Sequence, residues 1–142
     1  MTIARLIAGR DRPIVHCSAQ QSVREAAGLL AENRIGALPV LDGGKVIGIF
    51  SERDLLYCAD RHGGAALDLS VAEAMTAPPI TVQSSSSVLE ALELMTRRRI
   101  RHLPVIDGER LVAFVSIGDL VKYRLDLIES EAQAMRDYIR TA

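Results

Sequence analysis

The sequence has little of what marks a disulfide-bonded, metal-binding or aromatic-rich protein. Its 142 residues include two cysteines, three histidines and no tryptophan. Cys17 and Cys58 lie far apart and form no C-x-x-C pattern, so we expect both thiols to be reduced and inert. The histidines His16, His62 and His102 share no close spacing with each other or with a cysteine. We therefore predict no metal site.

Long apolar runs and an excess of one charge are also lacking. No stretch of about 18 apolar residues occurs, and the apolar stretch at the N-terminus is too short for a signal peptide. The formal net charge of −1 provides no overall attraction to nucleic acid or to an anionic membrane. The basic run Arg97 to Arg99 falls in the last turn of a predicted helix, where cations favour the helix dipole. We expect a cytoplasmic protein with no nucleic-acid or membrane partner.

What the chain does contain is an internal repeat. A shift of 65 positions, which places Pro39 on Pro104, matches three stretches without a gap. The matched stretches are Ser22 to Ala26 with Ser87 to Ala91, Arg34 to Gly43 with Arg99 to Gly108, and Ser51 to Leu55 with Ser116 to Leu120. One structural unit therefore occurs twice.

The strands of each copy are predicted from short β-branched and apolar runs. A first strand is expected at Ile14–Val15 and, in the second copy, at Ile80 to Val82. Leu38 to Leu41 and Val46 to Phe50 flank an Asp-Gly-Gly turn and predict a β-hairpin, repeated at Leu103 to Val115. Each unit thus begins with a strand and carries a hairpin after its first helix.

The helices are predicted from caps and apolar stripes. Ser22 with Glu25, and Ser87 with Glu90, have the S-x-x-E spacing of a capping box. Apolar residues then follow at helical spacing, at Val23, Ala26, Ala27 and Leu30 and at Val88, Ala91, Leu92 and Met95. A second helix is expected to start at Ser51 and at Ser116, which gives a β-α-β-β-α order for each unit.

Other local signals concern the prolines and the connection between the copies. Pro39 and Pro104 cannot donate a ladder hydrogen bond, so each is expected at a strand start or on an edge. The composition of Arg61 to Ala66 predicts a flexible linker, and Val71 to Thr76 a short helix. We place the first repeat at 8–62, a linker with a short helix at 63–75, the second repeat at 76–124 and a C-terminal helix extension at 125–142.

Neither copy is expected to fold alone, because about 50 residues bury too little apolar area to offset chain entropy. The two sheets are therefore predicted to pack on each other. The last helix is expected to run from Ile117 to about Ile139. Its apolar positions are Leu120, Val121, Leu127, Ile128, Ala132, Met135 and Ile139. This stripe predicts a homodimer surface.

Two segments carry the candidate chemistry, Gly48 to Asp54 and Ala113 to Asp119, each ending in Ser-x-x-Asp. One interpretation is a second pair of capping boxes. The other is a ligand site, because a carboxylate at a helix start can accept hydrogen bonds from both hydroxyls of a ribose, beside backbone N–H groups suited to phosphate. Both can hold at once.

The tandem repeat, the R-I-x-x-L-P-V strand, the Asp-Gly turn and the Ser-x-x-Asp end together resemble a pair of CBS domains over nearly the whole chain. Ser51 to Asp54 is similar to the Ser-Glu-Arg-Asp sequence of small stand-alone bacterial CBS-pair proteins. The resemblance implies an α/β fold of two repeats packed sheet to sheet about a pseudo-twofold axis. It also implies an adenosyl ligand such as AMP, ADP, ATP, NAD or S-adenosylmethionine in the clefts between repeats, and a role in energy or redox sensing.

Carried over residue by residue, the resemblance implies two mixed clefts. In one, Ser51, Arg53 and Asp54 would lie with Ile80, Ile100, Arg101 and His102. In the other, Ser116 and Asp119 would lie with Val15, Ile35, Gly36 and Ala37. The aspartates would bind ribose, the apolar residues would sandwich adenine beside the backbone of the first strand, and the arginines and histidine would meet phosphate.

The copies differ at Gly36 and Ala37, which become Arg101 and His102, and at Gly48, which becomes Ala113. A glycine would allow close approach of a ligand to the backbone, so the sequence ranks the Asp54 site above the Asp119 site. A ligand-free dimeric interaction protein is the alternative function. An enzyme is disfavoured, because the sequence has no Walker loop, metal cluster or triad pattern.

Overall fold

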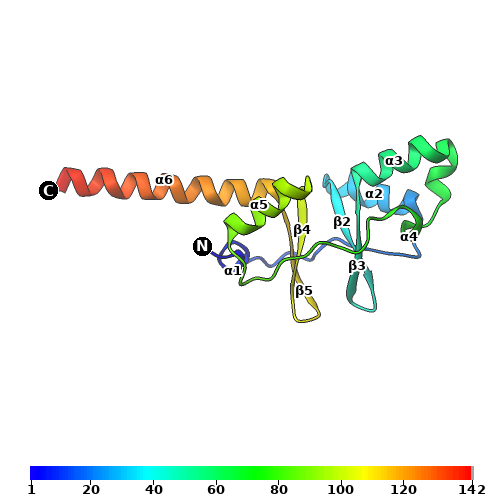
Figure 1. The fold of residues 1–142 in the computed structure, drawn as a ribbon, viewed down its shortest axis with the longest axis horizontal. Coiled ribbons are helices and arrows are strands. Elements are labelled where there is room, and N and C mark those ends of the chain that lie inside the picture. The colour runs from blue at the N-terminus through cyan, green and yellow to red at the C-terminus, as the bar shows by residue number, and fades with distance from the viewer. Residues whose placement is uncertain (142) are drawn as a thin grey trace.

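The two copies of the repeat fold alike in the computed structural model, which describes residues 1–141. The first copy contains α2 (Val23–Asn33), β2 (Ala37–Asp42), β3 (Lys45–Ser51) and α3 (Glu52–His62). The second contains α5 (Val88–Arg98), β4 (His102–Asp107), β5 (Arg110–Ser116) and α6 (Ile117–Thr141). The two hairpins lie side by side in the centre, with α2 and α3 outside one of them and α5 and α6 outside the other (Figure 1). The fold is the predicted α/β pair of repeats.

The helix caps and the hairpin-turn glycines lie at the positions predicted from the sequence. Ser22 Oγ accepts a hydrogen bond from the Glu25 N–H at 3.1 Å, and Ser87 Oγ accepts one from the Glu90 N–H at 2.9 Å. The reciprocal half of the capping box forms only at Ser87. The hairpin turns are closed by glycines with positive φ, such as Gly108 at 65°. Both helix starts and both turns are therefore set by local chemistry.

The first strand of each repeat begins later than predicted, and in the second repeat it is also shorter. β1 is Cys17–Ser18, paired in parallel with β2, and its counterpart in the second repeat is a single bridge between Val82 and Val105. The Val82 N–H donates to the Pro104 carbonyl at 3.1 Å. The next bond toward Ile80 would need an N–H on Pro104, which proline lacks. The ladder therefore ends there, and the prediction of strands at Ile14–Val15 and at Ile80 was wrong.

Proline has a related place in the hairpins. Pro39 lies inside β2, which is the central strand of the order β1-β2-β3, so the expectation of a strand start or an edge strand was wrong. Pro39 pairs with Ile49, whose N–H donates instead to the Thr76 carbonyl at 2.9 Å. The nitrogen of Pro39 thus faces the side where β1 has already ended, and no ladder bond is lost there.

The segment between the repeats is folded, which corrects the prediction of a flexible linker at residues 61–66. α3 continues to His62 and is followed by the 3-10 helix η1 (Gly63–Asp68). Ala66 is 1% exposed, and its carbonyl lies 3.9 Å from the Cys58 sulfur. Small side chains let this segment pack closely on α3. The short helix α4 (Val71–Ala74) follows, two residues shorter than predicted.

Each repeat has its own core, and each core includes a helix from outside the repeat. Val71 of α4 is buried in the core of the first repeat. Ile3 of α1 (Ile3–Ile7), near the N-terminus, is buried in the core of the second. The Ile3 N–H donates to the Ser86 carbonyl at 2.9 Å, and the Val71 N–H donates to the Gln21 carbonyl at 2.8 Å. The segments that precede the repeats therefore hold the two halves together.

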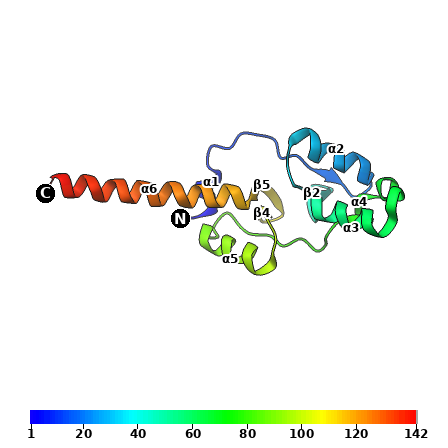
Figure 2. The same ribbon diagram turned by 90° about the horizontal axis from the view of Figure 1, so that it is seen from above.

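The helix α6 extends far beyond the rest of the chain (Figures 1 and 2). Leu120, which the sequence assigned to its exposed stripe, is instead fully buried in the core of the second repeat. Val121, Ile128, Met135 and Ile139 of that stripe are exposed, as is Leu125, which the sequence prediction left out. Among residues 1–141, no helix is both long and apolar enough to cross a membrane.

Candidate functional site: two clefts between the repeats

Two clefts of about 740 Å³ each are lined by residues of both repeats, and we name them after their aspartates. The Asp54 cleft is lined by Gly36, Ala37, Ile49, Ser51, Glu52, Arg53, Asp54, Leu56, Tyr57, Thr76, Pro78, Pro79, Ile80, Ile100, Arg101 and His102. The Asp119 cleft is lined by Arg10, Arg12, Pro13, Ile14, Val15, Asn33, Arg34, Ile35, Gly36, Ala37, His102, Val112, Ala113, Phe114, Ser116 and Asp119.

The structure brings the sequence-predicted residues together in the two predicted groups. All seven residues grouped with Asp54 line the Asp54 cleft, and all six grouped with Asp119 line the Asp119 cleft. Gly36, Ala37 and His102 line both clefts, whereas the sequence assigned each of them to one. The clefts therefore meet at these residues. The role of every one of these side chains toward a ligand stays a prediction.

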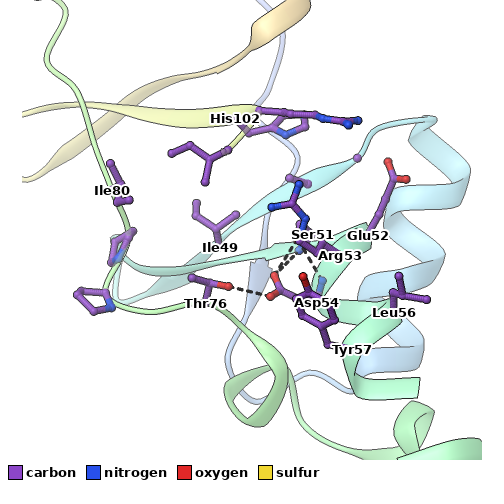
Figure 3. A pocket seen from close by; sticks show the side chains of 16 residues that line it. Ile49, Ser51, Glu52, Arg53, Asp54, Leu56, Tyr57, Thr76, Ile80 and His102 are labelled. Atoms are coloured by element: carbon purple, nitrogen blue, oxygen red, sulfur yellow. Dashed lines mark hydrogen bonds between the residues drawn. The ribbon is translucent and has the colours of Figure 1, made fainter. Parts of the chain in front are cut away.

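Three hydrogen-bond donors from two residues hold the Asp54 carboxylate at the start of α3 (Figure 3). Its Oδ2 accepts hydrogen bonds from the Ser51 N–H at 2.8 Å and from the Ser51 hydroxyl at 3.0 Å. Its Oδ1 accepts one from the Thr76 hydroxyl at 2.7 Å, and the residue is 8% exposed. This carboxylate is rigid and already well supplied with donors.

Asp119 holds the equivalent place at the start of α6 but is more open. Its Oδ2 accepts a hydrogen bond from the Ser116 N–H at 2.9 Å and lies 3.5 Å from a guanidinium nitrogen of Arg10. The Asp119 side chain is 37% exposed. No hydrogen bond to its Oδ1 is found within residues 1–141. Asp119 can therefore accept hydrogen bonds from a ligand without giving up its own.

Gly48 does not line either cleft, which corrects the reason for ranking the Asp54 cleft first. A Cβ at Gly48 would lie 2.7 Å from the Met75 sulfur and 3.0 Å from the Thr76 carbonyl oxygen. The absent side chain thus makes room for the segment that pairs with Ile49 through two backbone hydrogen bonds. Ala113 carries that methyl group in the second repeat, and the corresponding segment near Arg10 makes no such bridge to β5 among the described residues.

The segments that precede each repeat also line the clefts, and none of their residues but Val15 and Ile80 was predicted to do so. Thr76 and Pro78 line the Asp54 cleft, and Arg10, Arg12 and Pro13 line the Asp119 cleft. A signal for them was present, since the same shift of 65 positions places Pro13 on Pro78. Tyr57 and Leu56, on the exposed side of α3, had no such signal, because Lys122 and Val121 replace them in the other copy. Glu52 is an exposed residue of α3 that also lines the Asp54 cleft.

The backbone beside each cleft has unused hydrogen-bonding groups. Because the ladders end at Cys17 and Val82, no backbone–backbone hydrogen bond within residues 1–141 involves Val15 or Ile80. Val15 lines the Asp119 cleft and Ile80 lines the Asp54 cleft. A buried backbone group without a partner is costly, so these groups favour a polar ligand edge or water. These backbone groups are free because Pro39 of β2 and Pro104 of β4 have no N–H to extend the ladders.

The clefts differ in charge. The ionisable side chains of the Asp54 cleft, apart from His102 and Tyr57, are two arginines and two carboxylates: Arg53, Arg101, Glu52 and Asp54. Those of the Asp119 cleft, again apart from His102, are three arginines and one carboxylate: Arg10, Arg12, Arg34 and Asp119. The Arg53 guanidinium also donates to the Arg99 carbonyl at 2.9 Å. The Asp119 cleft therefore has the stronger attraction for an anionic group.

His102 lies between the two clefts, and its ring stacks on Phe114 with centroids 5.6 Å apart. Burial lowers the pKa of His102 below its usual value, and Arg101 lowers it further. The carboxylates of Glu52 and Asp119 act in the opposite direction but do not overcome the burial. The ring is therefore neutral near neutral pH, and it contributes shape and a hydrogen bond more than charge.

The lowered pKa of His102 predicts that the folded protein loses stability in mild acid. Between its ordinary pKa and its folded pKa, the unfolded chain binds a proton that the folded chain resists, so stability falls as pH falls through this window. The melting temperature should drop by a few degrees from about pH 7.5 to about pH 5.5. The drop should be smaller in His102→Ala, which matches Ala37 of the first repeat. An equal or larger drop in the variant would show that other groups cause the acid sensitivity.

No three His, Cys, Asp or Glu side chains of residues 1–141 gather in a position to hold a metal ion. Both cysteines are free and buried, and burial raises the pKa of the Cys17 thiol to about 11. A thiol with so high a pKa is a poor nucleophile. What the clefts offer is therefore a binding surface of carboxylates, arginines, apolar walls and free backbone groups.

Comparison with known proteins gives one family. The family model described as CBS domain matches residues 10–60 and 71–126. A solved structure of a CBS-domain containing protein from Agrobacterium tumefaciens superposes with a TM-score of 0.82 at 40% identity. The alignment covers 87% of this chain and 99% of that one. Both copies of the repeat are thus included in the match.

Two further relatives extend the comparison. The mitochondrial CBS domain-containing protein CBSX3 of Arabidopsis thaliana is 34% identical over 129 residues, which are 87% of this chain and 63% of CBSX3. The chain thus spans less than two thirds of the length of that relative. The structure of CBSX2 in complex with AMP superposes with a TM-score of 0.76 at 26% identity, and the alignment covers 89% of this chain and 97% of that one.

Proposed function

Because this chain belongs to the CBS-domain family, we propose that it is a regulatory module that binds an adenosine-containing ligand in the clefts between its two repeats. The observation that carries the proposal is the placement of Asp119. Its carboxylate lies at the start of a helix, partly exposed, in a cleft that is also lined by three arginines and by Val15 with its free backbone groups. A ribose, a phosphate and an adenine edge each find a matching group there. The AMP bound by CBSX2 supports this ligand class.

The charges of the clefts indicate which ligand each one takes. Arg10, Arg12 and Arg34 favour a ligand with several phosphates in the Asp119 cleft, because guanidinium groups bind phosphate oxygens in pairs. In the Asp54 cleft two carboxylates offset two arginines, so a ligand of low net charge, such as S-adenosylmethionine, fits better. We therefore propose ATP or ADP for the Asp119 cleft.

The Asp54 cleft also fits the alternative in which a Ser-x-x-Asp motif only caps a helix. The carboxylate of Asp54 is used by Ser51 and Thr76, and it fixes α3 to the segment between the repeats. In that alternative, the Asp54 cleft is structural and holds no ligand, and only the Asp119 cleft binds one. Catalysis is not part of the proposal. The Ser51 and Thr76 hydroxyls that contact the Asp54 carboxylate belong to the helix cap and to its tie with the segment between the repeats.

A thermal-shift screen with AMP, ATP, NAD and S-adenosylmethionine tests the proposal. A ligand bound by the folded state alone raises the melting temperature by about 5–10 °C at a hundredfold excess over its Kd. ATP should give the largest shift, and the shift should shrink when Arg10 and Arg12 are both replaced by alanine. Inorganic triphosphate serves as the control for phosphate binding alone. The absence of a shift with all four compounds would refute the sensor function.

A further inference from the structure

The exposed side of α6 carries an apolar seam with coiled-coil spacing. We define the seam as Val121, Leu125, Ile128, Ala132, Met135 and Ile139, positions that alternate steps of four and three residues. The five large members are between 42% and 65% exposed, and Ala132 is exposed as well. Such a repeat over about 27 Å of helix is the pattern of a helix that pairs with another helix.

The seam does not face the rest of its own chain. The side of α6 that packs on the second repeat carries Leu120, which is fully buried, and Tyr123, which is partly buried in the same core. At 100° per residue, Leu120 lies roughly 100° and Tyr123 roughly 160° around the helix from the centre of the seam. α6 leaves the body of the molecule within its first turns (Figures 1 and 2). The seam is therefore open to a partner along its whole length.

The charged residues beside the seam indicate that the partner is a second copy of this chain. In heptad notation, Leu125, Ala132 and Ile139 are the a positions of the seam and Val121, Ile128 and Met135 are the d positions. In a parallel, in-register pair, the residue just before each a position faces the residue five places later in the other helix. Arg124 then faces Glu129 of the other copy, and Glu131 faces Arg136. Both contacts join opposite charges, and twofold symmetry makes each of them twice. Arg124 also lies 3.3 Å from the Met1 sulfur, a contact that leaves its charge available.

The antiparallel arrangement of the same seam is disfavoured by the same residues. Aligning Val121 with Ile139 of a reversed copy places Lys122 against Arg136 and sets Glu129 against Glu129 of the other copy. Glu131 would likewise face its own equivalent. Like charges at these flanking positions select against a pairing. Charge therefore discriminates between the two directions in favour of parallel helices.

We propose that α6 forms a parallel, in-register, two-stranded coiled coil with α6 of a second copy, which places both pairs of repeats at the same end of the dimer. Leu125 at an a position before Ile128 at a d position is the order found in four-stranded coils. Ala132 in the middle of the seam opposes that arrangement, because four alanines around one axis would leave a void. Two strands leave no central space to fill.

Disulfide trapping tests the direction of the helices. Ile139→Cys should form a covalent dimer on mild oxidation, because the parallel seam brings the two copies of position 139 together. In an antiparallel pair, position 139 of each copy would lie beside Val121 of the other, so the two cysteines would be about 27 Å apart and could not link. Arg140→Cys, one residue further on and facing outward, is the matched control and should stay monomeric on a denaturing gel. Equal cross-linking of the two variants, or none in Ile139→Cys, would overturn the proposal.

Charge exchange tests the pairing and the number of strands. Glu131→Arg should weaken the dimer by about tenfold in sedimentation equilibrium, since it turns two attractive contacts into repulsive ones. The double variant with Glu131→Arg and Arg136→Glu should regain the affinity of the native chain. Equally weakened dimer affinity in the single and the double variant would overturn the proposal. So would a native chain that is a monomer, or a tetramer, at every concentration. All of these positions lie outside the two clefts, so the nucleotide shift of each variant reports separately on the proposed ligand site.

Discussion

Asp119→Ala is expected to weaken the binding of ATP by about 30-fold to 100-fold. The open carboxylate is the group that we assign to the two ribose hydroxyls, and two charge-assisted hydrogen bonds contribute together about 2–3 kcal/mol. The cost to the fold is small, because Asp119 accepts one backbone hydrogen bond and its other contact is the exposed pair with Arg10. Titration calorimetry of native protein and variant measures the effect.

The matched control for this experiment is Asp126→Ala. Asp126 lies two turns further along α6, is exposed and lines neither cleft, so its removal changes the net charge equally without touching the site. ATP binding should be unchanged in that variant. If Asp119→Ala bound ATP as the native chain does while Asp54→Ala lost it, the nucleotide would occupy the other cleft and our assignment would be wrong.

Asp54→Ala is expected to lower the free energy of unfolding by about 2–3 kcal/mol. The carboxylate is nearly buried and accepts hydrogen bonds from Ser51 and Thr76, so its loss leaves the Ser51 N–H and the Thr76 hydroxyl without a partner. The same change also frees the segment that lies over Gly48. Urea denaturation of the two alanine variants gives the comparison.

Asp119→Ala is the reference variant in this second experiment. Its free energy of unfolding should fall by about 1 kcal/mol, because only one cap hydrogen bond disappears. Thr76→Val should reproduce part of the loss seen in Asp54→Ala, since it removes one of the three donors. Equal destabilisation by the two aspartate substitutions would contradict the view that Asp54 is mainly structural and Asp119 mainly available to a ligand.

Much of the site was predictable because the repeat carries it. The shift that aligns Pro39 with Pro104 also aligns Asp54 with Asp119, and the resemblance to CBS domains then grouped the residues of each cleft as the structure places them. The capped helices and glycine turns were predictable for a different reason. Their signals act over three or four residues, and the structure has them where the sequence indicated.

What the sequence could not provide depends on contacts between distant segments. Gly48 was interpreted as space for a ligand, but its neighbour is the backbone of Thr76, which no local pattern reveals. The hydrogen bond from Thr76 to Asp54 likewise joins residues far apart in sequence. The late start of the first strand, at Cys17, follows from Pro39 on the neighbouring strand. Burial of Ala66 in a glycine-rich and alanine-rich stretch is also a tertiary effect.

The two clefts meet at Gly36, Ala37 and His102, so an occupant of one cleft can affect the other. His102 is the bulkiest of the three, and it stacks on Phe114, which lines the Asp119 cleft. A ligand that displaces this ring would change the wall of both clefts at once. On the proposed function, a ligand in each cleft would be coupled to the other through this shared wall.

A crystal structure of the protein grown with ATP tests the central claim most directly. The account predicts the nucleotide in the Asp119 cleft, with its ribose hydroxyls on the carboxylate of Asp119, its adenine edge at the backbone of Val15 and its phosphates toward Arg10 and Arg12. Electron density for the nucleotide in the Asp54 cleft alone, or in neither cleft at saturating ATP, would contradict it.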